Sequence, residues 1–184
     1  MKKKIIVFGA STSNKSINQQ LATHCTTYLK DTEAMILNLN DFPMPIFDVD
    51  YEAENGSPEK ANELSALFDT AEGFIVSLAE HNGSYSAAFK SIYDWLSRIN
   101  GKVWRNKPVL LLSTSPGGRG GKSVMETAAA SFPFMGAQVS GTFSLPSFND
   151  NFDSNDGLKN EEHQEEVKNL IRIFEKAVTN NESV

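Results

Sequence analysis

The stretch "KIIVFGASTSNKSINQQLATHCTTYLKD" (residues 4–31) combines an apolar run, a polar loop and a segment in which apolar residues recur every three or four positions. The run at 4–9 is almost continuously apolar, as expected of a strand that is buried on both faces of a sheet. The spacing in 16–31 predicts a helix with one apolar face. The stretch therefore predicts one unit of strand, loop and helix.

The same alternation continues along the chain. Further apolar runs predict strands at 33–39, 73–78, 108–114 and 137–143. Further amphipathic segments predict helices at 58–71, 86–99, 122–135 and 160–178. Pro133 must bend or end the third of these helices, because proline cannot donate a helical hydrogen bond.

Five such units predict an α/β fold, a three-layer sandwich with helices on both faces of a five-stranded parallel sheet. The commonest strand order for this pattern is 2-1-3-4-5. In that order a ligand lies beyond the carboxyl ends of the strands, near the first and the third. The loops after the first, third and fourth strands are therefore the candidate site.

The composition predicts one globular domain over residues 1–184, and the formal net charge of −6 argues against a nucleic-acid partner. The single cysteine, Cys25, excludes an internal disulfide and fits a reducing compartment. The apolar run at 5–10 is too short for a signal peptide, and no run is long enough to span a bilayer. We therefore expect a cytoplasmic protein without a membrane partner.

The loop after the first strand, "GASTSNKSIN" (9–18), carries Ser11, Ser13, Ser16 and Asn18 and opens directly into the predicted helix. Hydroxyl groups beside the free N–H groups of a helix N-terminus form an anion site that suits a phosphate monoester. The alternative is an ordinary helix cap with Ser16 at the N-cap position. The loop lacks the G-x-G-x-x-G pattern of a dinucleotide site.

The loop after the third strand places Glu80, His81, Asn82 and Gly83 at the same predicted edge, and "NGS" (82–84) indicates a turn. Polar groups and exposed backbone there would surround a flat slot. No other histidine has metal-ligand spacing with His81, so we expect no metal site.

The loop after the fourth strand, "STSPGGRGGKS" (113–123), is close to the phosphate loop of nucleotide triphosphatases. Pro116 stands where that loop requires its first glycine, and proline has no N–H to offer a phosphate. Glycine-rich backbone at the ligand edge of the sheet instead suits a flat ring. Arg119 would either cover this ring or attract a negatively charged cosubstrate. The alternative is a flexible surface loop that caps the next helix.

Together the three loops resemble those of the NAD(P)H-dependent FMN reductases of the flavodoxin-like superfamily. The first loop is similar to that family's G-S-x-R-x-x-S-x-N pattern at Ser11, Ser16 and Asn18. "EHNGS" (80–84), followed by "DW" (94–95), resembles the second pattern, and "KPVLLLSTSPGGRGG" (107–121) resembles the third. The resemblance covers about residues 4–145, with Ser13 in place of an arginine and His81 in place of a tyrosine.

The resemblance implies bound FMN, hydride transfer from NADPH or NADH, and an electron acceptor such as a quinone, an azo or nitro compound or free flavin. It assigns the FMN phosphate to Ser11, Ser13, Ser16, Ile17 and Asn18. It assigns the flavin ring to Glu80, His81, Asn82, Gly83, Ser113, Ser115, Gly117, Gly118 and Arg119. No catalytic side chain is expected, because the flavin carries the chemistry.

Two alternatives on the same fold remain at this point. A non-enzymatic FMN electron carrier would share the loops, although such carriers are usually more acidic. A receiver-like module is disfavoured, because the first loop has no Asp or Glu.

The segment 39–52 is apolar and rich in proline, and Pro43 and Pro45 should keep it out of a helix. Its apolar side chains would form an exposed patch of Phe42, Met44, Ile46 and Phe47. We expect a homodimer through this patch and the 84–98 segment. The alternative is a loop that folds over the sheet edge.

Overall fold

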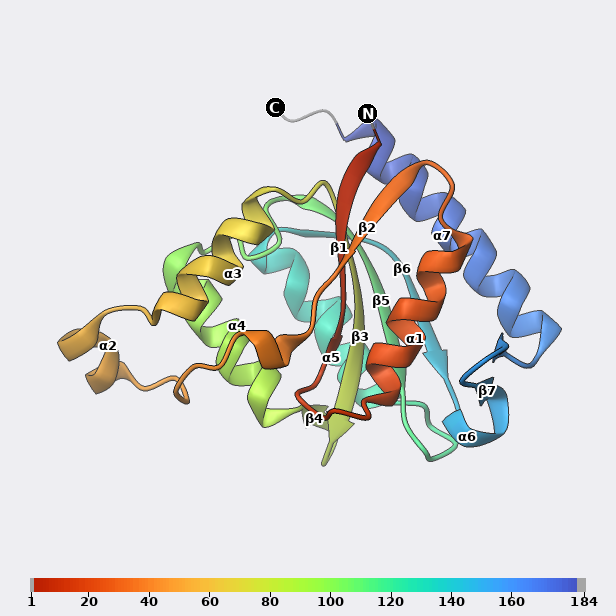
Figure 1. Ribbon diagram of the computed structural model, residues 1–184, viewed down its shortest axis with the longest axis horizontal. Coiled ribbons are helices and arrows are strands. Elements are labelled where there is room, and N and C mark those ends of the chain that lie inside the picture. Colours follow the sequence, from red (N-terminus) through yellow and green to blue (C-terminus); the bar gives the residue numbers. More distant parts are fainter. Residues whose placement is uncertain (1, 182–184) are drawn as a thin grey trace.

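The computed structural model describes residues 2–181, and a parallel sheet runs through its centre (Figure 1). Its strands are β1 (Lys3–Ala10), β2 (Thr32–Ile36), β3 (Phe74–His81), β4 (Ser84–Tyr85), β5 (Lys107–Thr114) and β6 (Ala137–Leu145). Five of them lie parallel in the order β2-β1-β3-β5-β6, which is the predicted order. The sixth, β4, was not predicted and pairs antiparallel with the end of β3.

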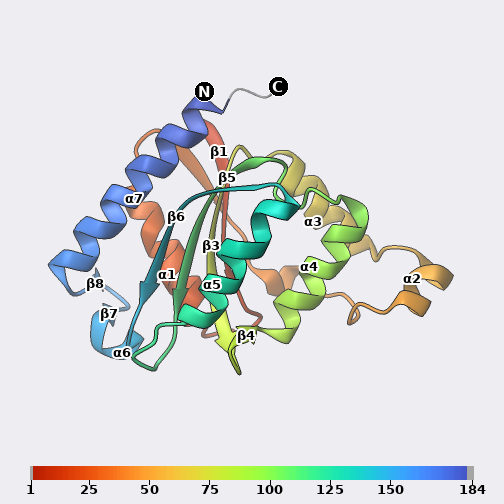
Figure 2. The same ribbon diagram turned by 180° about the vertical axis from the view of Figure 1, so that it is seen from behind.

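Helices cover both faces of the sheet and form the predicted three layers. They are α1 (Ile17–Cys25), α2 (Val49–Asn55), α3 (Glu59–Asp69), α4 (Ala87–Ile99), α5 (Lys122–Ser131), α6 (Phe148–Asn151) and α7 (Glu161–Asn180). Three 3₁₀ helices join them, η1 (Thr26–Tyr28), η2 (Leu39–Asp41) and η3 (Phe132–Met135). Figures 1 and 2 show α1 and α7 on one face and α3, α4 and α5 on the other.

The central strands are buried on both sides, because alternate side chains point to opposite faces. In β1, Ile6 and Phe8 pack into the core beneath α3, α4 and α5, whereas Ile5 and Val7 pack into the core beneath α1 and α7. Cys25 belongs to the second core, and burial raises the pKa of its thiol to about 12. Cys25 is therefore a small apolar residue of the core.

The largest differences from the predicted helix boundaries are at the ends of α1 and α5. The first predicted helix ends as an α-helix at Cys25 and continues as the 3₁₀ turn η1. The helix predicted over 122–135 ends at Ser131, and Pro133 lies in the following 3₁₀ turn η3, as a proline in that position requires.

The proline-rich segment 39–52 is only partly as expected. Pro43 and Pro45 lie in irregular chain, but α2 begins at Val49, where Asp48 accepts a hydrogen bond from the Tyr51 N–H. The prediction that Phe42 belongs to an exposed apolar patch is wrong, because Phe42 is buried. Ile46 is 83% exposed and fits the expectation.

Trp95 anchors this segment to α4. It is fully buried, and its indole N–H donates to the Pro45 carbonyl at 2.8 Å. Its ring also lies edge-on to Phe47, with 4.9 Å between the centroids. The segment therefore folds over α4, with Ile46 left outside.

A buried carboxylate joins the start of β2 to α7. Glu175 is 5% exposed, and its Oε1 accepts the backbone N–H groups of Asp31 and Thr32 and the Thr32 hydroxyl, at 2.8 to 2.9 Å. A buried charge that accepts several hydrogen bonds is well satisfied. Nothing in the spacing of the last helix distinguishes Glu175 from its exposed acidic neighbours.

Candidate functional site

The β1–α1 loop presents donors without acceptors. Ser16 caps α1, because its Oγ accepts the Gln19 N–H at 3.1 Å. Within residues 2–181, the N–H groups of Ile17 and Asn18 have no acceptor, and neither has the Ser16 hydroxyl proton. Ser16 is also 8% exposed, so its proton has little access to water. Such a set of donors at a helix N-terminus is suited to an anion.

The loops after β1, β3 and β5 meet around one cavity of about 190 Å³, at the carboxyl edge of the sheet. Figure 1 shows these loops together at the lower edge. The cavity is lined by Ser11, Ser13, Lys15, Ser16, Ile17, Asn18, Ala79, Glu80, His81, Thr114, Ser115 and Pro116. The sequence thus predicted which loops converge, and eight of the fourteen predicted site residues line this cavity.

Asn18 turns its amide away from this cavity and into the sheet. Its Nδ2 donates to the Thr114 carbonyl at 3.1 Å, and its Oδ1 accepts the Thr114 N–H at 3.0 Å and the Ser77 hydroxyl at 2.8 Å. The side chain therefore ties the start of α1 to β3 and β5. What Asn18 offers to a ligand is its backbone N–H.

The side chains of Ser113 and Glu80 also form hydrogen bonds that stabilise the fold around the cavity. Ser113 is fully buried, and its hydroxyl lies 2.8 Å from the Gly120 carbonyl. Glu80 accepts the N–H of Val124, in the first turn of α5, at 3.0 Å. Because α5 has no side-chain cap of its own, Glu80 supplies the missing acceptor from the neighbouring strand.

The remaining predicted residues lie on the rim or beyond it. Asn82 and Gly83 both have positive φ, 52° and 75°, and form the tight turn between β3 and β4 that Asn-Gly favours. Gly117 and Gly118 lie at an open rim, where a Cβ on Gly118 would meet no atom within 4 Å. Arg119 lies beyond this rim and lines a different cavity.

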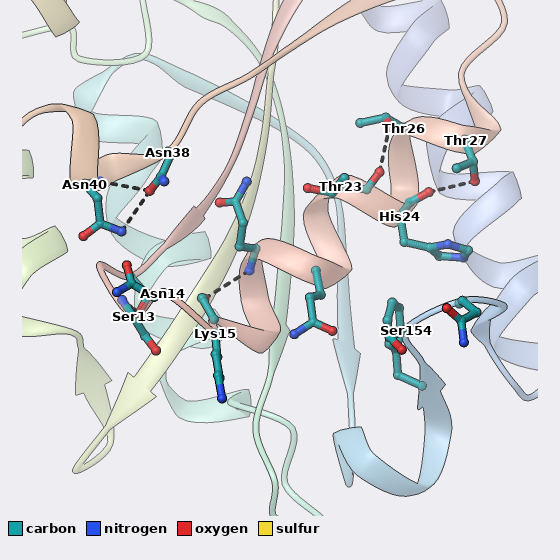
Figure 3. Close-up of a pocket in the computed structure, with 17 residues that line it drawn as sticks. Ser13, Asn14, Lys15, Thr23, His24, Thr26, Thr27, Asn38, Asn40 and Ser154 are labelled. Atoms are coloured by element: carbon teal, nitrogen blue, oxygen red, sulfur yellow. Dashed lines mark hydrogen bonds between the residues drawn. The ribbon is translucent and has the colours of Figure 1, made fainter.

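A second, polar groove runs from the same loop along the outer side of α1 (Figure 3). It has a volume of about 560 Å³ and shares Ser11, Ser13, Lys15 and Ser16 with the first cavity. One wall is the short hairpin of β7 (Phe152–Asp153) and β8 (Gly157–Leu158), which the sequence analysis missed.

His24 holds this hairpin against α1. Its Nε2 lies 3.1 Å from the Tyr28 hydroxyl and 3.4 Å from the Leu158 N–H. Its ring is edge-on to Phe152, and burial lowers its pKa from the ordinary value. His24 is thus a packing residue. Two further residues that line the first cavity, Ala79 and Thr114, lie at the ends of apolar strands, and the sequence analysis did not single them out.

Residues 2–181 contain no group of three His, Cys, Asp or Glu side chains placed to hold a metal ion. None of the helices in that range is both long and apolar enough to cross a membrane.

A doubly wound sheet with a cavity at its carboxyl edge defines the class of this protein as an α/β domain whose candidate ligand site lies at the switch between β1 and β3. Residues 3–150 match the family model described as NADPH-dependent FMN reductase. The chain therefore belongs to the NADPH-dependent FMN reductase family, which confirms the resemblance of the loops.

Known reductases are similar to this chain in sequence or in structure. A quinone reductase of Escherichia coli K12 is 33% identical over 78 residues, which is 42% of this chain and 42% of the relative, so less than half of either length is matched. The structure of FerB, an NAD(P)H:(acceptor) oxidoreductase of Paracoccus denitrificans, has a TM-score of 0.76 at 20% identity, covering 96% of this chain and 97% of that one. An FMN-dependent NADH-azoreductase of Bacillus anthracis, in complex with FMN, has a TM-score of 0.57 at 16% identity, covering 97% and 98%. At these identities the two structures show the fold alone.

Proposed function

We propose that the protein is an FMN-dependent oxidoreductase that passes hydride from NADPH or NADH to a small-molecule acceptor. The observation that carries this proposal is the cavity at the carboxyl edge, where the Ser16 hydroxyl proton and the N–H groups of Ile17 and Asn18 find no acceptor among residues 2–181 and lie beside the glycine rim. The family match and the arrangement of the three loops support it.

The residues present fit FMN. The phosphate would lie against the hydroxyls of Ser11, Ser13 and Ser16 and the N–H groups of Ile17 and Asn18. Among the described residues that line this cavity, Lys15 supplies a cation. The absence of an arginine at position 13 does not remove the site, because a helix N-terminus and hydroxyl groups together hold phosphate.

The flavin ring would lie against the 80–83 and 115–118 backbone, where Gly83, Gly117 and Gly118 leave no side chain in the way. When bound, FMN would supply the hydride-transfer chemistry between the nicotinamide nucleotide and the acceptor. The chain's own part is to hold the phosphate and to keep the loop backbone rigid through Asn18, Ser113 and Glu80.

For the acceptor we propose a quinone. The E. coli relative is a quinone reductase, and curated plant relatives are named NADPH:quinone oxidoreductases. Azo compounds, nitro compounds and free flavin are the other acceptors to assay.

Ser16→Ala tests the phosphate assignment. The variant loses a hydroxyl donor and the N-cap of α1, so we expect the dissociation constant for FMN to rise about tenfold. A fluorescence titration with FMN measures it. Ser97→Ala, which removes a hydroxyl that donates only to the Asp94 carbonyl on α4, is the control and should leave the constant unchanged. Equal affinity of wild type and Ser16→Ala would contradict the assignment.

We also propose that the protein forms a homodimer through the segment 42–51 and α4. Three large hydrophobic side chains of this region are exposed: Ile46 by 83%, Val49 by 67% and Tyr51 by 38%. Beside them lies a mainly apolar cavity of about 410 Å³ between Phe42, Met44 and α4. A second copy of the chain would cover these surfaces.

Light scattering should therefore give twice the chain mass, and Ile46→Asp should shift the protein to the monomer because it places a charge in the interface. Phe134→Asp is the control, since Phe134 is 80% exposed on η3, outside the proposed interface. A monomeric wild type would overturn the proposal.

A further inference from the structure

The polar groove along α1 and the proposed phosphate cavity share part of their walls. Ser11, Ser13, Lys15 and Ser16 line both spaces, and the groove has a volume of about 560 Å³. Figure 3 shows the loop with Ser13 and Lys15 at one end of the groove and the hairpin with Ser154 at the other, with α1 between them. A molecule with a phosphate at the N-terminus of α1 therefore has a path along this helix.

Ser16 lies where the two spaces meet. It is 8% exposed, and its hydroxyl proton has no acceptor within residues 2–181. From Ser16 to Thr23 the helix rises about 10 Å, which is close to the length of an extended nucleoside monophosphate. The groove is thus long enough for a second nucleotide joined to the phosphate of FMN.

The walls of the groove are fixed by contacts within the protein. On one side of α1 the Gln19 side chain accepts the Gly9 N–H at 2.7 Å and donates to the Leu37 carbonyl at 3.2 Å. On the other side the hairpin packs so closely that a Cβ on Gly157 would overlap the His24 ring. The groove therefore exists before a ligand arrives, as is usual for a binding site.

The lining of the groove is free of carboxylates. None of the 17 described residues that line it is Asp or Glu, although the chain has 23 acidic and 17 basic residues. Asp153 lies on the hairpin, but its carboxylate accepts the N–H groups of Asn155 and Asp156 within the turn. Lys15 has no ion-pair partner within residues 2–181. A phosphate in the groove would therefore meet a cation and no carboxylate along the walls.

Most of the other side chains that line the groove are uncharged and polar. Six of them form no side-chain hydrogen bond within the described part of the chain: Ser13, Asn14, Gln20, Thr23, Ser154 and Asn155. Their hydroxyl and amide groups offer donors and acceptors to ribose hydroxyls and to the edge of a base. Asparagine and glutamine in particular pair with N6 and N7 of adenine. The lining therefore suits an adenosine.

We propose that this groove binds the adenylate half of FAD, so that the protein holds FAD as well as FMN. The flavin phosphate would stay at the N-terminus of α1, the second phosphate would face Lys15, and the adenosine would lie along α1 toward the hairpin. This inference rests on the proposed function, because that function places the flavin phosphate at Ser16. It makes Thr23 and Ser154 contacts of FAD alone, since neither lines the first cavity.

The test compares wild type with the double variant Thr23→Glu/Ser154→Glu, which adds two carboxylates to the groove. Isothermal titration calorimetry of the flavin-free protein gives the dissociation constants for FMN and FAD without turnover. We expect wild type to bind FAD at least as tightly as FMN. The double variant should bind FAD about tenfold more weakly, because its carboxylates repel the adenylate phosphate. Its constant for FMN should change by less than about twofold, because salt screens the more distant flavin phosphate.

The matched control is Thr70→Glu/Gln138→Glu. It adds the same charge at two exposed positions that do not line the groove, and it should leave both dissociation constants unchanged. A loss of FAD affinity in this control equal to that in the groove variant would show an effect of net charge alone and would overturn the proposal.

Amide hydrogen exchange gives a second readout. FAD should slow the exchange of residues 152–158, which form the hairpin wall, and FMN should leave it unchanged. Because nicotinamide nucleotides also carry an adenylate, NADH is titrated against the same proteins. A groove variant that loses affinity for NADH and keeps its affinity for FAD would assign the groove to the cosubstrate and overturn the proposal.

The remaining outcomes separate this inference from the proposed function. Wild type that binds FAD at least about tenfold more weakly than FMN would overturn the inference alone. An equal loss of FMN and FAD affinity in the groove variant would do the same. If neither flavin bound, the proposed function would fail, and the inference would fail with it.

Discussion

Replacing Asn18 with alanine is expected to lower the free energy of unfolding by about 4 kcal/mol, because it leaves several buried polar groups without partners. The Asn18 side chain is 3% exposed and makes three hydrogen bonds, two to the Thr114 backbone and one to the Ser77 hydroxyl. A loss of this size is a large share of the stability of an ordinary domain, which is about 5–15 kcal/mol. Chemical denaturation measures it directly.

The same variant should weaken FMN binding at least tenfold, because Asn18 fixes the start of α1, and with it the hydroxyl loop, against β3 and β5. Asn62→Ala is the matched control. Asn62 is exposed on α3 and bonds only to nearby carbonyls, so its loss should change the stability by less than about 0.5 kcal/mol. If the two alanine variants were equally stable, Asn18 would not be the tie described here.

Gly9→Ala is expected to destabilise the protein by about 3 kcal/mol, the upper range for overpacking. A Cβ on Gly9 would lie 2.4 Å from the backbone nitrogen of Gln19 and 2.7 Å from its Cα. Because these are main-chain atoms of α1, no side-chain rotation relieves the overlap. The helix must move away from β1, which also strains the 2.7 Å bond from the Gly9 N–H to the Gln19 side chain.

Gly101→Ala is the control for this substitution. Its Cβ would meet nothing within 4 Å and its φ is not positive, so the change should be neutral or slightly stabilising. Thermal unfolding followed by circular dichroism compares the two variants. A Gly9→Ala protein that melts with wild type would show that α1 does not need this close approach to β1.

The sequence predicted the sheet because the period of apolar residues is a local property. Continuous apolar runs such as 108–114 separate cleanly from helical spacing, and parallel strands place their following loops at one edge. The turn at Asn82 and Gly83 was predictable for a similar reason, since both residues tolerate positive φ.

The direction of polar side chains at that edge was not predictable. Asn18, Glu80 and Ser113 fit a ligand loop by type, yet each bonds to backbone or side chains of a neighbouring strand or helix. Those partners are distant in the sequence, so no spacing reveals them. Arg119 lies in the predicted loop, and only the three-dimensional path of the loop places it in the separate cavity beside α5, β6 and α7.

The missed helix α2 shows a different limit. Pro43 and Pro45 restrict the backbone only in their own neighbourhood. The chain after them carries the signals of a helix, with Asp48 as N-cap and Gly56, whose φ is 73°, at the end. The prediction gave the prolines more weight than these signals. The β7–β8 hairpin has two-residue strands, which are too short for any alternation to register.

The central claim is that the protein holds FMN and reduces it with a nicotinamide nucleotide. The most direct measurement is the visible spectrum of the protein after loading with FMN and desalting, recorded without air before and after adding NADPH. Our account predicts a flavin band that remains through desalting and bleaches on addition of NADPH. A protein that retains no flavin, or a retained flavin that stays oxidised with both NADPH and NADH, would contradict it.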